Sequence, residues 1–579
     1  MTAEPSRQPR LGGAVGAVGV TLLALVLRLW KLGAPHKLIF DETYYVKDAY
    51  SLLTRGVELK WAEEANAAFE AGDFSGLLAD PAYVVHPPVG KWLIAFGMWL
   101  FGPESSFGWR FSAAIAGTLG VLLTILIGWR LFRSQALGLL AGLLVAVDGI
   151  SLVLSRSGLL DIFLMLFALL ALWLVLKDRA VMDRRLAERM RQPIGHGPTG
   201  APIYPGRRVQ PVRPGGPDGI GKPGEDGIGK PGKPGKPSKP SGPREPGGPG
   251  LGMRWYLLGA GVALGLACGV KWSGLYFLAV YGLLVVCWDA AARRRAGLRG
   301  WLWTAVWRDG LKAFALMVPV ALVVYVASWT GWLATKAGYH RDWAQTHPGE
   351  GVQWLPDGLR SLVKYHQEAW GFHTTLTSEH DYESNPALWL LQARPTSFFY
   401  ESEPTCAAAS CSQAITALGN PLIWWVGVIA LGVVVYQAIV WADRRAWAIL
   451  CGYVAGYVPW LFFAERTIFT FYTVAFVPFV TLALAYAAGV VIGPVGVGRA
   501  GLRSAGVRSA GGSVLGGVSG FAGVSGSAER AARGPAPVVI VGVVVALMLF
   551  VSAFFWPIWT AESVPYQFWQ MHMWFSSWV

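Results

Sequence analysis

The sequence predicts an all-α protein that crosses a membrane many times, and three observations support this fold class. First, 54% of the 579 residues are hydrophobic and only 15% are charged, whereas about a quarter of a typical soluble chain is charged. Second, apolar runs of about 20 residues recur along the chain, which is the length that a helix needs to cross a bilayer core of about 30 Å. Third, the connectors rich in Lys and Arg all fall on one side when the runs are counted as spans.

The apolar runs give about eleven spans. They cover about residues 11–30, 110–130, 135–149, 159–176, two spans within 255–288, 311–332, one ending at the basic residues 443–445, one on either side of the turn 464–467, and 537–556. The first run lacks a small-residue cleavage site after it, so we interpret it as a span and not as a removed signal. Arg7 and Arg10 place the N-terminus on the cytoplasmic side, and the parity then places the C-terminus outside the cell membrane.

The connectors divide the chain into modules. An N-terminal transmembrane module, residues 1–192, contains a first extracytoplasmic loop, 31–109. Two further parts are transmembrane helices within 251–332 and a second extracytoplasmic loop, 333–420. The C-terminal transmembrane module, 421–579, contains a cytoplasmic loop rich in Gly, Arg and Ser at 493–534.

Residues 193–250 form an insert rich in Pro, Gly and Lys with broken Gly-x-y triplets. A collagen helix needs an unbroken register and three chains, so we expect a disordered cytoplasmic linker. Two functions stay open for it. Its basic residues either contact anionic lipids on the inner membrane surface, or the insert is only a solvated spacer.

The net charge of +14 does not predict nucleic-acid binding. Lys and Arg concentrate in the short connectors and in the insert, as expected for a membrane protein whose cytoplasmic side is positive. We therefore expect membrane lipids, and no nucleic acid, as partners of these charges.

Five cysteines are present, of which Cys406 and Cys411 lie close together in the polar sequence "PTCAAASCSQ". On the extracytoplasmic side this pair is expected to form a local disulfide. The loop offers too few ligands for a metal site, and no metal-binding residues are predicted.

An acid pair, Asp41 and Glu42, follows the first span in "KLIFDETYYVKDAY". Charged residues at membrane boundaries are costly and are therefore candidates for function. The topology places several of them at the same outer face as the acid pair: Arg28, His86, Lys91, Arg110, Arg156, Asp161 and Lys271. Structural explanations are open for most of them, such as a snorkelling Arg28, a solvated turn at His86 and Lys91, a turn closed by Arg156 and Asp161, or capping of helix carbonyls by Lys271.

The order of these motifs resembles that of the protein O-mannosyltransferase family. The chain contains "FDETYY", "HPPVGK", "WRFSAA", "SRSGLLDIFLMLF" and "LGLACGVKWSGLYF" in this order, and the likeness resumes in "HDYESNPALWLLQARPTSFFYE" and "ERTIFTFYTVAFVPF". The resemblance implies a glycosyltransferase of the GT-C type. The second outer loop is too short for the β-trefoil (MIR) domain of eukaryotic members, so the chain is similar to the short bacterial form. The His-rich signature of the eukaryotic late spans is replaced here by "ERTIFTFY".

The resemblance implies inverting transfer of mannose from polyprenyl-phosphate-mannose to Ser or Thr hydroxyls of proteins. A carboxylate near the acceptor would act as general base, and the family pattern assigns this role to Asp41, with Glu42 orienting the acceptor or a cation. Cations would stabilise the phosphate leaving group. Arg28 and Arg110 are the first choices from the family pattern, and Arg466 is a choice from its location. His86, Lys91, Arg156 and Lys271 are further choices.

Two other functions remain as alternatives. A GT-C enzyme that modifies a lipid or cell-wall glycan would use the same acid and cations with a different acceptor groove. A transporter is disfavoured because the charges lie at span ends and no repeat is evident. No obligatory cofactor is predicted, a divalent metal is left open, and recruitment to the Sec translocon and the oligomeric state are not specified by any residue.

Overall fold

A computed structural model describes residues 11–191, 195–196, 202–203, 248–402, 405–493 and 535–579. The chain divides into two compact units. The first unit comprises residues 1–177, 255–284 and 315–579, and the second comprises 178–254 and 285–314. Most of the predicted insert, and nearly all of the predicted cytoplasmic loop 493–534, lie outside the described residues. The module boundaries predicted from the sequence stay predictions.

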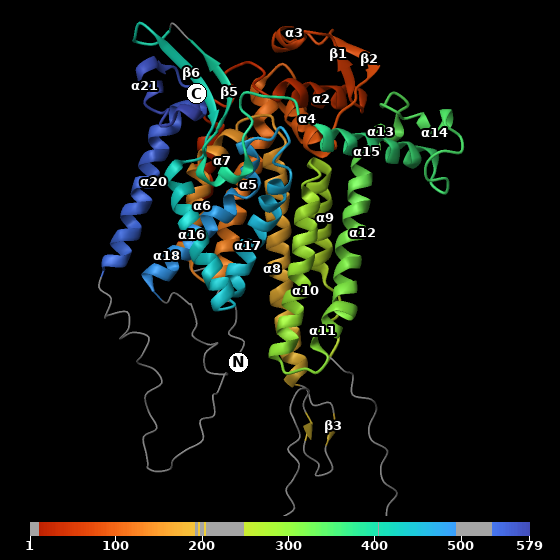
Figure 1. The fold of residues 1–579 in the computed structure, drawn as a ribbon, viewed down its shortest axis with the longest axis vertical. Coiled ribbons are helices and arrows are strands. Elements are labelled where there is room, and N and C mark those ends of the chain that lie inside the picture. The colour runs from red at the N-terminus through yellow and green to blue at the C-terminus, as the bar shows by residue number, and fades with distance from the viewer. Residues whose placement is uncertain (1–10, 192–194, 197–201, 204–247, 403–404, 494–534) are drawn as a thin grey trace, which may run out of the picture. The chain divides into compact units, whose positions relative to one another are not determined.

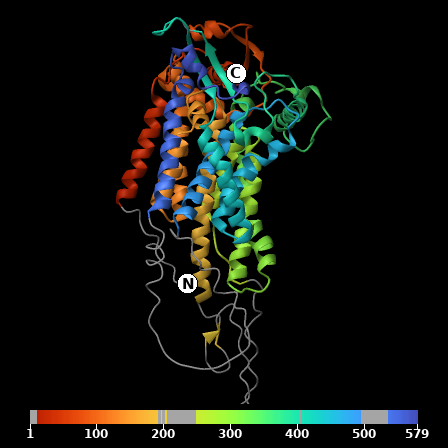
Figure 2. The same ribbon diagram turned by 60° about the vertical axis from the view of Figure 1, so that its left-hand side comes forward.

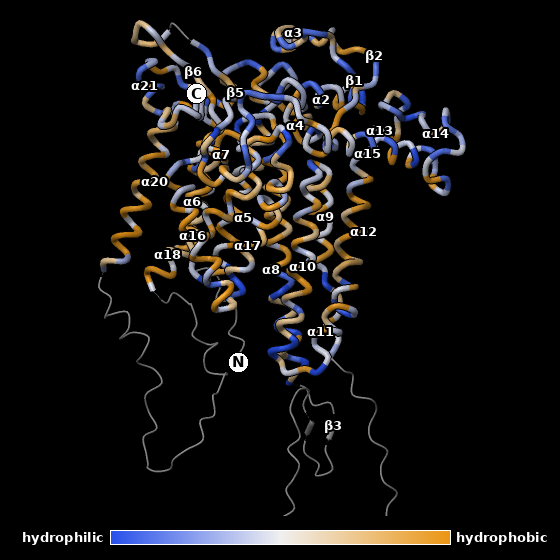
Figure 3. The backbone as a smooth tube through the Cα atoms, viewed as in Figure 1, coloured by the Kyte–Doolittle hydropathy of each residue, from blue (hydrophilic) through white to orange (hydrophobic). Residues whose placement is uncertain are grey.

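The first unit is a helical bundle whose long helices run side by side (Figures 1 and 2). Its long helices, some of which continue into the second unit, are α1 (Leu11–Leu29), α4 (Val89–Phe101), α5 (Ser106–Phe132), α6 (Gln135–Val147), α8 (Asp161–Arg191), α9 (Trp255–Val270), α10 (Gly274–Arg295), α12 (Leu311–Ser328), α16 (Pro421–Val440), α17 (Arg444–Gly456), α18 (Val477–Ile492) and α20 (Ala536–Thr560). Their residues are mostly hydrophobic, whereas the segments at one end of the bundle are more polar (Figure 3). This pattern is that of an apolar bundle that carries its polar loops at the ends of its helices.

The segments gathered at that end carry the remaining elements of the first unit. The helices are α2 (Glu42–Arg55), α3 (Asn66–Glu70), α7 (Gly149–Leu154), α13 (Thr330–Ala334), α14 (Trp343–Thr346), α15 (Asp357–Thr375), α21 (Tyr566–Gln570) and the 3₁₀ turns η2 (Pro386–Leu391), η3 (Val458–Phe462), η4 (Thr470–Ala475) and η6 (Ser576–Trp578). The strands are β1 (Leu59–Trp61), β2 (Leu77–Pro81), β5 (Thr396–Glu401), β6 (Cys411–Ala417) and β7 (Val564–Pro565). β1 pairs with β2, and β5, β6 and β7 form a three-stranded sheet in this order.

The segment 61–78 forms less helix than its local residue pattern suggests. The helix-like spacing of "WAEEANAAFEAGDFSGLL" extends over residues 61–78, but the helix α3 covers only Asn66–Glu70. Trp61 and Leu77 instead pair across the β1–β2 ladder. The aromatic rings of Trp61, Phe69 and Phe74 pack together over this ladder, so tertiary packing overrides the local periodicity.

Each of the eleven predicted spans coincides with a helix. Six helices are long and apolar enough to cross a membrane by length and composition: Leu11–Leu29, Ser106–Phe132, Gly274–Arg295, Trp301–Ser328, Pro421–Val440 and Ala536–Thr560. The other five predicted spans fall on α6, α8, α9, α17 and α18, which are shorter or carry more charge. The multi-pass helical architecture is thereby confirmed, and the number eleven stays a prediction.

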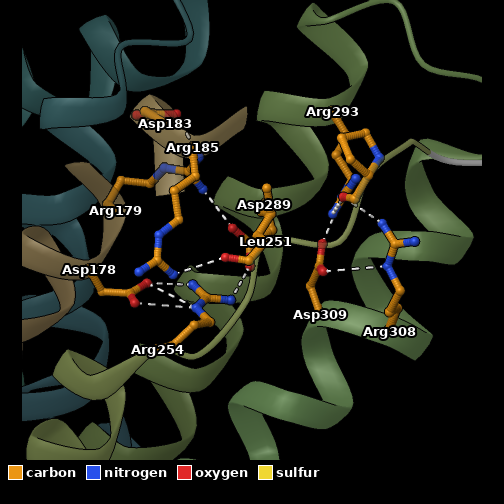
Figure 4. Close-up of polar contacts among 11 residues, drawn as sticks. Asp178, Arg179, Asp183, Arg185, Leu251, Arg254, Asp289, Arg293, Arg308 and Asp309 are labelled. Atoms are coloured by element: carbon orange, nitrogen blue, oxygen red, sulfur yellow. Dashed lines mark hydrogen bonds and ion pairs between the residues drawn. The ribbon is translucent and has the colours of Figure 1, made fainter. Parts of the chain in front are cut away.

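The second unit is held together by a buried network of ion pairs (Figure 4). It contains the ends of α8 and α10, α11 (Trp301–Thr304), the π-helix η1 (Ala305–Gly310), the start of α12, and the short strand pair β3 (Gly195–His196) and β4 (Pro202–Ile203). Arg254 pairs with Asp178 at 2.5 Å and with Asp289 at 2.6 Å, and Asp289 also accepts from Arg179 at 2.6 Å. Because each buried charge has an opposite partner, the network fixes the helix ends of this unit.

Candidate functional site

Asp41 lies at the start of α2, where the chain turns out of the segment that follows α1. Its carboxylate makes no capping bond to the helix and instead accepts a hydrogen bond from the Tyr45 hydroxyl, one helical turn further on. Burial raises the pKa of Asp41 to about 6, and the negative charge of Asp161 acts in the same direction. The positive charge of Lys271 opposes both effects. Asp41 is therefore a carboxylate of raised basicity that is ionised at neutral pH.

Lys271 and Asp161 form an ion pair beside Asp41. The Lys271 Nζ lies 2.9 and 2.8 Å from the two carboxylate oxygens of Asp161, and 4.6 Å from the ring centroid of Tyr472. Lys271 sits in the break between α9 and α10, Asp161 is the first residue of α8, and Tyr472 lies in η4. Four separate segments, including the start of α2, thus place ionisable groups at one point.

A cleft of only about 10 Å³, which is room for about one water molecule, lies beside this pair. It is lined by Asp161 and Leu164 of α8, Ser273 and Phe277 after the helix break, and a set of late residues, Ala455, Gly456, Trp460, Tyr472 and Ala475. The cleft is therefore polar at Asp161 and apolar along most of its wall.

Glu42 faces away from this centre and forms a buried ion pair with Arg110. Its two carboxylate oxygens accept from the Nε and Nη2 of Arg110, both at 2.8 Å, and from the backbone N–H groups of Gly158 and Ile39. Arg110 donates its other N–H groups to the carbonyls of Leu32, Pro35 and Lys37. All five guanidinium N–H groups are therefore in use within the protein, and Arg110 has none left for a phosphate.

Arg28 is fully buried, and its guanidinium N–H groups are also bound within the protein. Its Nε donates to the Ser155 hydroxyl at 3.1 Å and its Nη2 donates to the Ser151 hydroxyl at 3.0 Å. The remaining N–H groups reach the carbonyls of Ala24, Val145 and Ala146. The sequence predicted a phosphate ligand at Arg28, but in this structure the side chain ties α1 to the end of α6 and to α7.

Arg156 takes a similar structural position. Its guanidinium donates to the carbonyls of Leu27, Arg28, Trp30 and Lys31, at the end of α1. The last carbonyls of a helix lack partners within the helix, so a cation there both satisfies them and complements the helix dipole. Arg156 does not pair with Asp161, which binds Lys271 instead.

His86 and Lys91 of the "HPPVGK" motif separate in the structure. The buried Lys91 ammonium pairs with Glu58 at 2.5 Å and lies 3.6 Å from Asp48, so it stabilises the first loop. The His86 ring lies 6.0 Å from Tyr45 and 5.5 Å from His373. Burial and the charge of Lys271 lower the pKa of His86 well below its usual value. His86 is therefore a neutral ring at the border of the site.

Arg466 is a half-buried cation near the same centre. Its Nε has no hydrogen-bond partner among the described residues. Its positive charge contributes to lowering the pKa of His86 and of His373. Arg466 also interacts electrostatically with Tyr472. Among the arginines predicted as phosphate ligands, Arg466 therefore differs from Arg28 and Arg110, whose N–H groups are all in use.

Three side chains of the site were not singled out from the sequence. Tyr45 lies within "FDETYY", and its spacing of four residues from Asp41 on a helix could have identified it. Tyr472 and His373 come from segments far away in the sequence, so no local signal pointed to them.

A disulfide joins Cys406 and Cys411 at a Cα–Cα distance of 5.9 Å. Among the described residues no group of three or more His, Cys, Asp and Glu side chains could hold a metal.

Comparisons with known proteins find the same family along most of the chain. Residues 85–187 match the family described as dolichyl-phosphate-mannose-protein mannosyltransferase. Residues 359–578 match the C-terminal four-helix region of protein O-mannosyltransferases.

Relatives that match most of this chain are named as mannosyltransferases that act on proteins. A polyprenol-phosphate-mannose–protein mannosyltransferase of Mycolicibacterium smegmatis is 34% identical over 498 residues, which is 83% of this chain and 82% of the relative. The protein of the same name from Mycobacterium tuberculosis is 31% identical and covers 98% of this chain and 92% of its own length. A donor-bound Pmt1–Pmt2 protein O-mannosyltransferase complex of Saccharomyces cerevisiae superposes with a TM-score of 0.63 at 14% identity, covering 99% of this chain and 93% of the matched chain. This last likeness concerns the fold.

Proposed function

This chain belongs to the protein O-mannosyltransferase family, and we propose that it transfers mannose from polyprenyl-phosphate-mannose to Ser or Thr hydroxyls of proteins. The observation that carries the proposal is the half-buried Asp41 carboxylate, which lies beside the Lys271–Asp161 pair and takes a hydrogen bond from Tyr45. A base next to a cation is what this transfer needs, because the acceptor loses a proton while the leaving group gains negative charge.

Asp41 is the general base in this mechanism. The acceptor hydroxyl gives its proton to the Asp41 carboxylate as its oxygen attacks the anomeric carbon of mannose, and the bond from that carbon to the phosphate oxygen breaks. A single displacement of this kind inverts the anomeric centre. The raised pKa of Asp41, about 6, brings the base closer to neutral pH while leaving it ionised there.

Lys271 and Arg466 are the cations that we assign to the leaving phosphate. Lys271 holds one anionic partner, Asp161, at 2.8 Å, and an ammonium has three N–H donors. Arg466 is half-buried with a guanidinium Nε that has no partner among the described residues. The phosphate is already a good leaving group, so a second acid is not required.

Arg28, Arg110, Arg156 and Lys91 are assigned a positioning role instead of direct phosphate contact. The three arginines donate N–H groups to carbonyls, hydroxyls or carboxylates of the chain itself, and the Lys91 ammonium forms an ion pair with Glu58. Glu42 likewise holds Arg110 and the backbone of Gly158, and through them the segment that precedes Asp41. These contacts set the position of Asp41 without touching the substrate.

The protein is a multi-pass membrane protein by its family and its apolar helices. We further propose that the acid pair faces the outer side of the cell membrane, with the N-terminus inside and the C-terminus outside. The basic connectors support this orientation. So does the disulfide between Cys406 and Cys411, because disulfides persist in oxidising compartments.

The test is transfer of labelled mannose from polyprenyl-phosphate-mannose to a Ser/Thr-containing peptide in membranes that contain the full chain. We expect label in the peptide, in α linkage if the donor is β-linked. Label that appears only in lipid or glycan would support the alternative acceptor class and contradict the proposal.

A further inference from the structure

A short sheet with an open edge lies beside the proposed base. β5 pairs along one side with β6, which in turn pairs with β7. Within the part of the chain that the structure describes, no strand pairs with the other side of β5. Figure 1 shows β5 on the side of this sheet that is nearer to α2, the helix that begins directly after Asp41.

The open strand is fixed against the segment that carries Asp41. The Phe398 ring of β5 stacks on the Phe40 ring with a centroid distance of 4.7 Å and an interplanar angle of 5°. Phe40 directly precedes Asp41 and adopts a left-handed backbone with a φ of 47°. Lys37 forms an ion pair with Glu401 at the end of β5. One face of β5 is thus in direct contact with the residue before the base.

The backbone of β5 is available for a further strand. Among the described residues, the backbone groups of residues 397–400 form hydrogen bonds only in the β5–β6 ladder. Every second residue of an edge strand directs its N–H and C=O away from its partner. The register also shifts between Ser397 and Phe399. Such bulges are common next to active sites, where they turn a strand edge toward a ligand.

We infer that the acceptor polypeptide binds as an additional strand along the open edge of β5. This inference rests on the proposed function, because it names how the substrate of the same site is held. In a sheet, residues directly opposite each other on adjacent strands share a face. A Ser or Thr of the acceptor that lies opposite Phe398 would therefore point to the same face of the sheet as Phe398. Phe40 stacks on this face, and Asp41 is the next residue of the chain, so the hydroxyl would lie on the side of the proposed base.

This mode of binding recognises the main chain of the acceptor. The hydrogen bonds of an added strand come from backbone groups, whereas side-chain pockets supply any selectivity at alternate positions. The acceptor must then be extended and locally unfolded around its hydroxyl residue. A hydroxyl within a folded helix would be a poor substrate.

The first experiment alters the substrate, so that folding of the enzyme is not affected. A Thr-containing peptide of about ten residues is methylated at one backbone nitrogen at a time, and kcat/KM is measured with the full chain and labelled donor. We expect a period of two: methylation at alternate positions lowers kcat/KM about tenfold or more, and methylation between them has little effect. Equal losses at all positions, or losses only at the neighbours of Thr, would contradict strand addition.

The second experiment assigns the strand to β5. Ser397→Cys places a thiol on the open edge, and Ser563→Cys places one beside β7, at the opposite edge of the same sheet, as the matched control. Under mild oxidation we expect a peptide with Cys next to its Thr to form a disulfide with the first variant and not with the second. Equal labelling of both variants, or disulfide-linked pairs of chains at position 397 in place of peptide adducts, would overturn the inference.

The two proposals fail in different ways. If the unmethylated peptide receives no mannose while a glycan or lipid does, the proposed acceptor class is wrong. If the unmethylated peptide is mannosylated without a period of two and without the Ser397→Cys adduct, the function stands and the binding mode is wrong.

Discussion

At the scale of single residues, the structure separates two kinds of charge that look alike in the sequence. Arg28 and Arg110 are buried and have no N–H group left over, whereas Lys271 and Arg466 lie where their charges act on the site. Likewise Asp41 is bound by Tyr45, but its neighbour Glu42 is saturated by Arg110 and backbone N–H groups. Adjacent acids thus have different partners because the start of a helix points them in different directions.

Replacing the proposed base gives the most direct test at this scale. Asp41→Asn keeps the shape of the side chain but cannot accept the proton, so we expect kcat to fall about 10²–10⁴-fold. Asp80→Asn, at an exposed aspartate of β2, is the control and should transfer mannose normally. Transfer is measured with labelled donor at equal amounts of inserted protein. Unchanged activity in Asp41→Asn would remove Asp41 from the mechanism.

The raised pKa of Asp41 predicts the acid limb of the pH profile. Because the carboxylate must be deprotonated to act as base, kcat/KM should rise as the pH increases through about 6. Lys271 lowers this pKa and Asp161 raises it. We therefore expect the limb to move to higher pH in Lys271→Met and to lower pH in Asp161→Asn, beside any loss of rate. Shifts in the same direction for both variants would contradict this electrostatic coupling.

At the scale of elements, the site depends on how the ends of helices are held. Glu42 and Arg110 join the start of α2 to α5, and Arg156 caps the end of α1. Lys271 is available because α9 stops at Val270 and α10 starts at Gly274, which leaves a break at which a side chain can enter the site. These junctions give basic residues in the motifs around the site a structural role, because their side chains hold the ends of helices in place.

The Glu42–Arg110 pair gives a prediction about stability. Glu42→Gln leaves the Arg110 guanidinium buried without its counter-ion, and breaking a buried pair of this kind typically costs about 3–5 kcal/mol. We expect a clearly lower thermal-unfolding temperature in detergent, together with reduced transfer. Glu63→Gln, at an exposed glutamate of the same loop, should leave both unchanged. Full stability of Glu42→Gln would show that the pair is not a structural anchor.

At the scale of the whole molecule, the family and the helical membrane architecture are confirmed. The proposed reaction centre lies entirely in the first unit, whose residues come from three stretches of the chain. The second unit has its own buried ion-pair network (Figure 4). The insert, residues 193–250, belongs to the second unit by its position in the chain. We therefore expect that the reaction does not require it.

Deleting residues 195–248 tests this division. We expect the shortened chain to insert into membranes and to transfer mannose at a rate within about twofold of the full chain, since loop length has only a weak effect on stability. Activity is measured in membranes and normalised to the inserted protein. A collapse of activity despite normal insertion would assign the insert a role in the reaction.

The sequence alone determined the composition, the periodic apolar runs and the motif order, and these were enough for the fold class and the family. A helix that lies in lipid is one continuous apolar segment, so it can be recognised from the sequence of that segment alone. The role of each charge was decided only by the tertiary structure. Whether Arg110 binds a ligand or the carbonyl of Pro35, 75 residues away, and whether Tyr472 lies next to Lys271, depends on segments that are far apart in the sequence. Hydrogen bonds and burial are properties of those contacts, and they do not exist until the chain has folded.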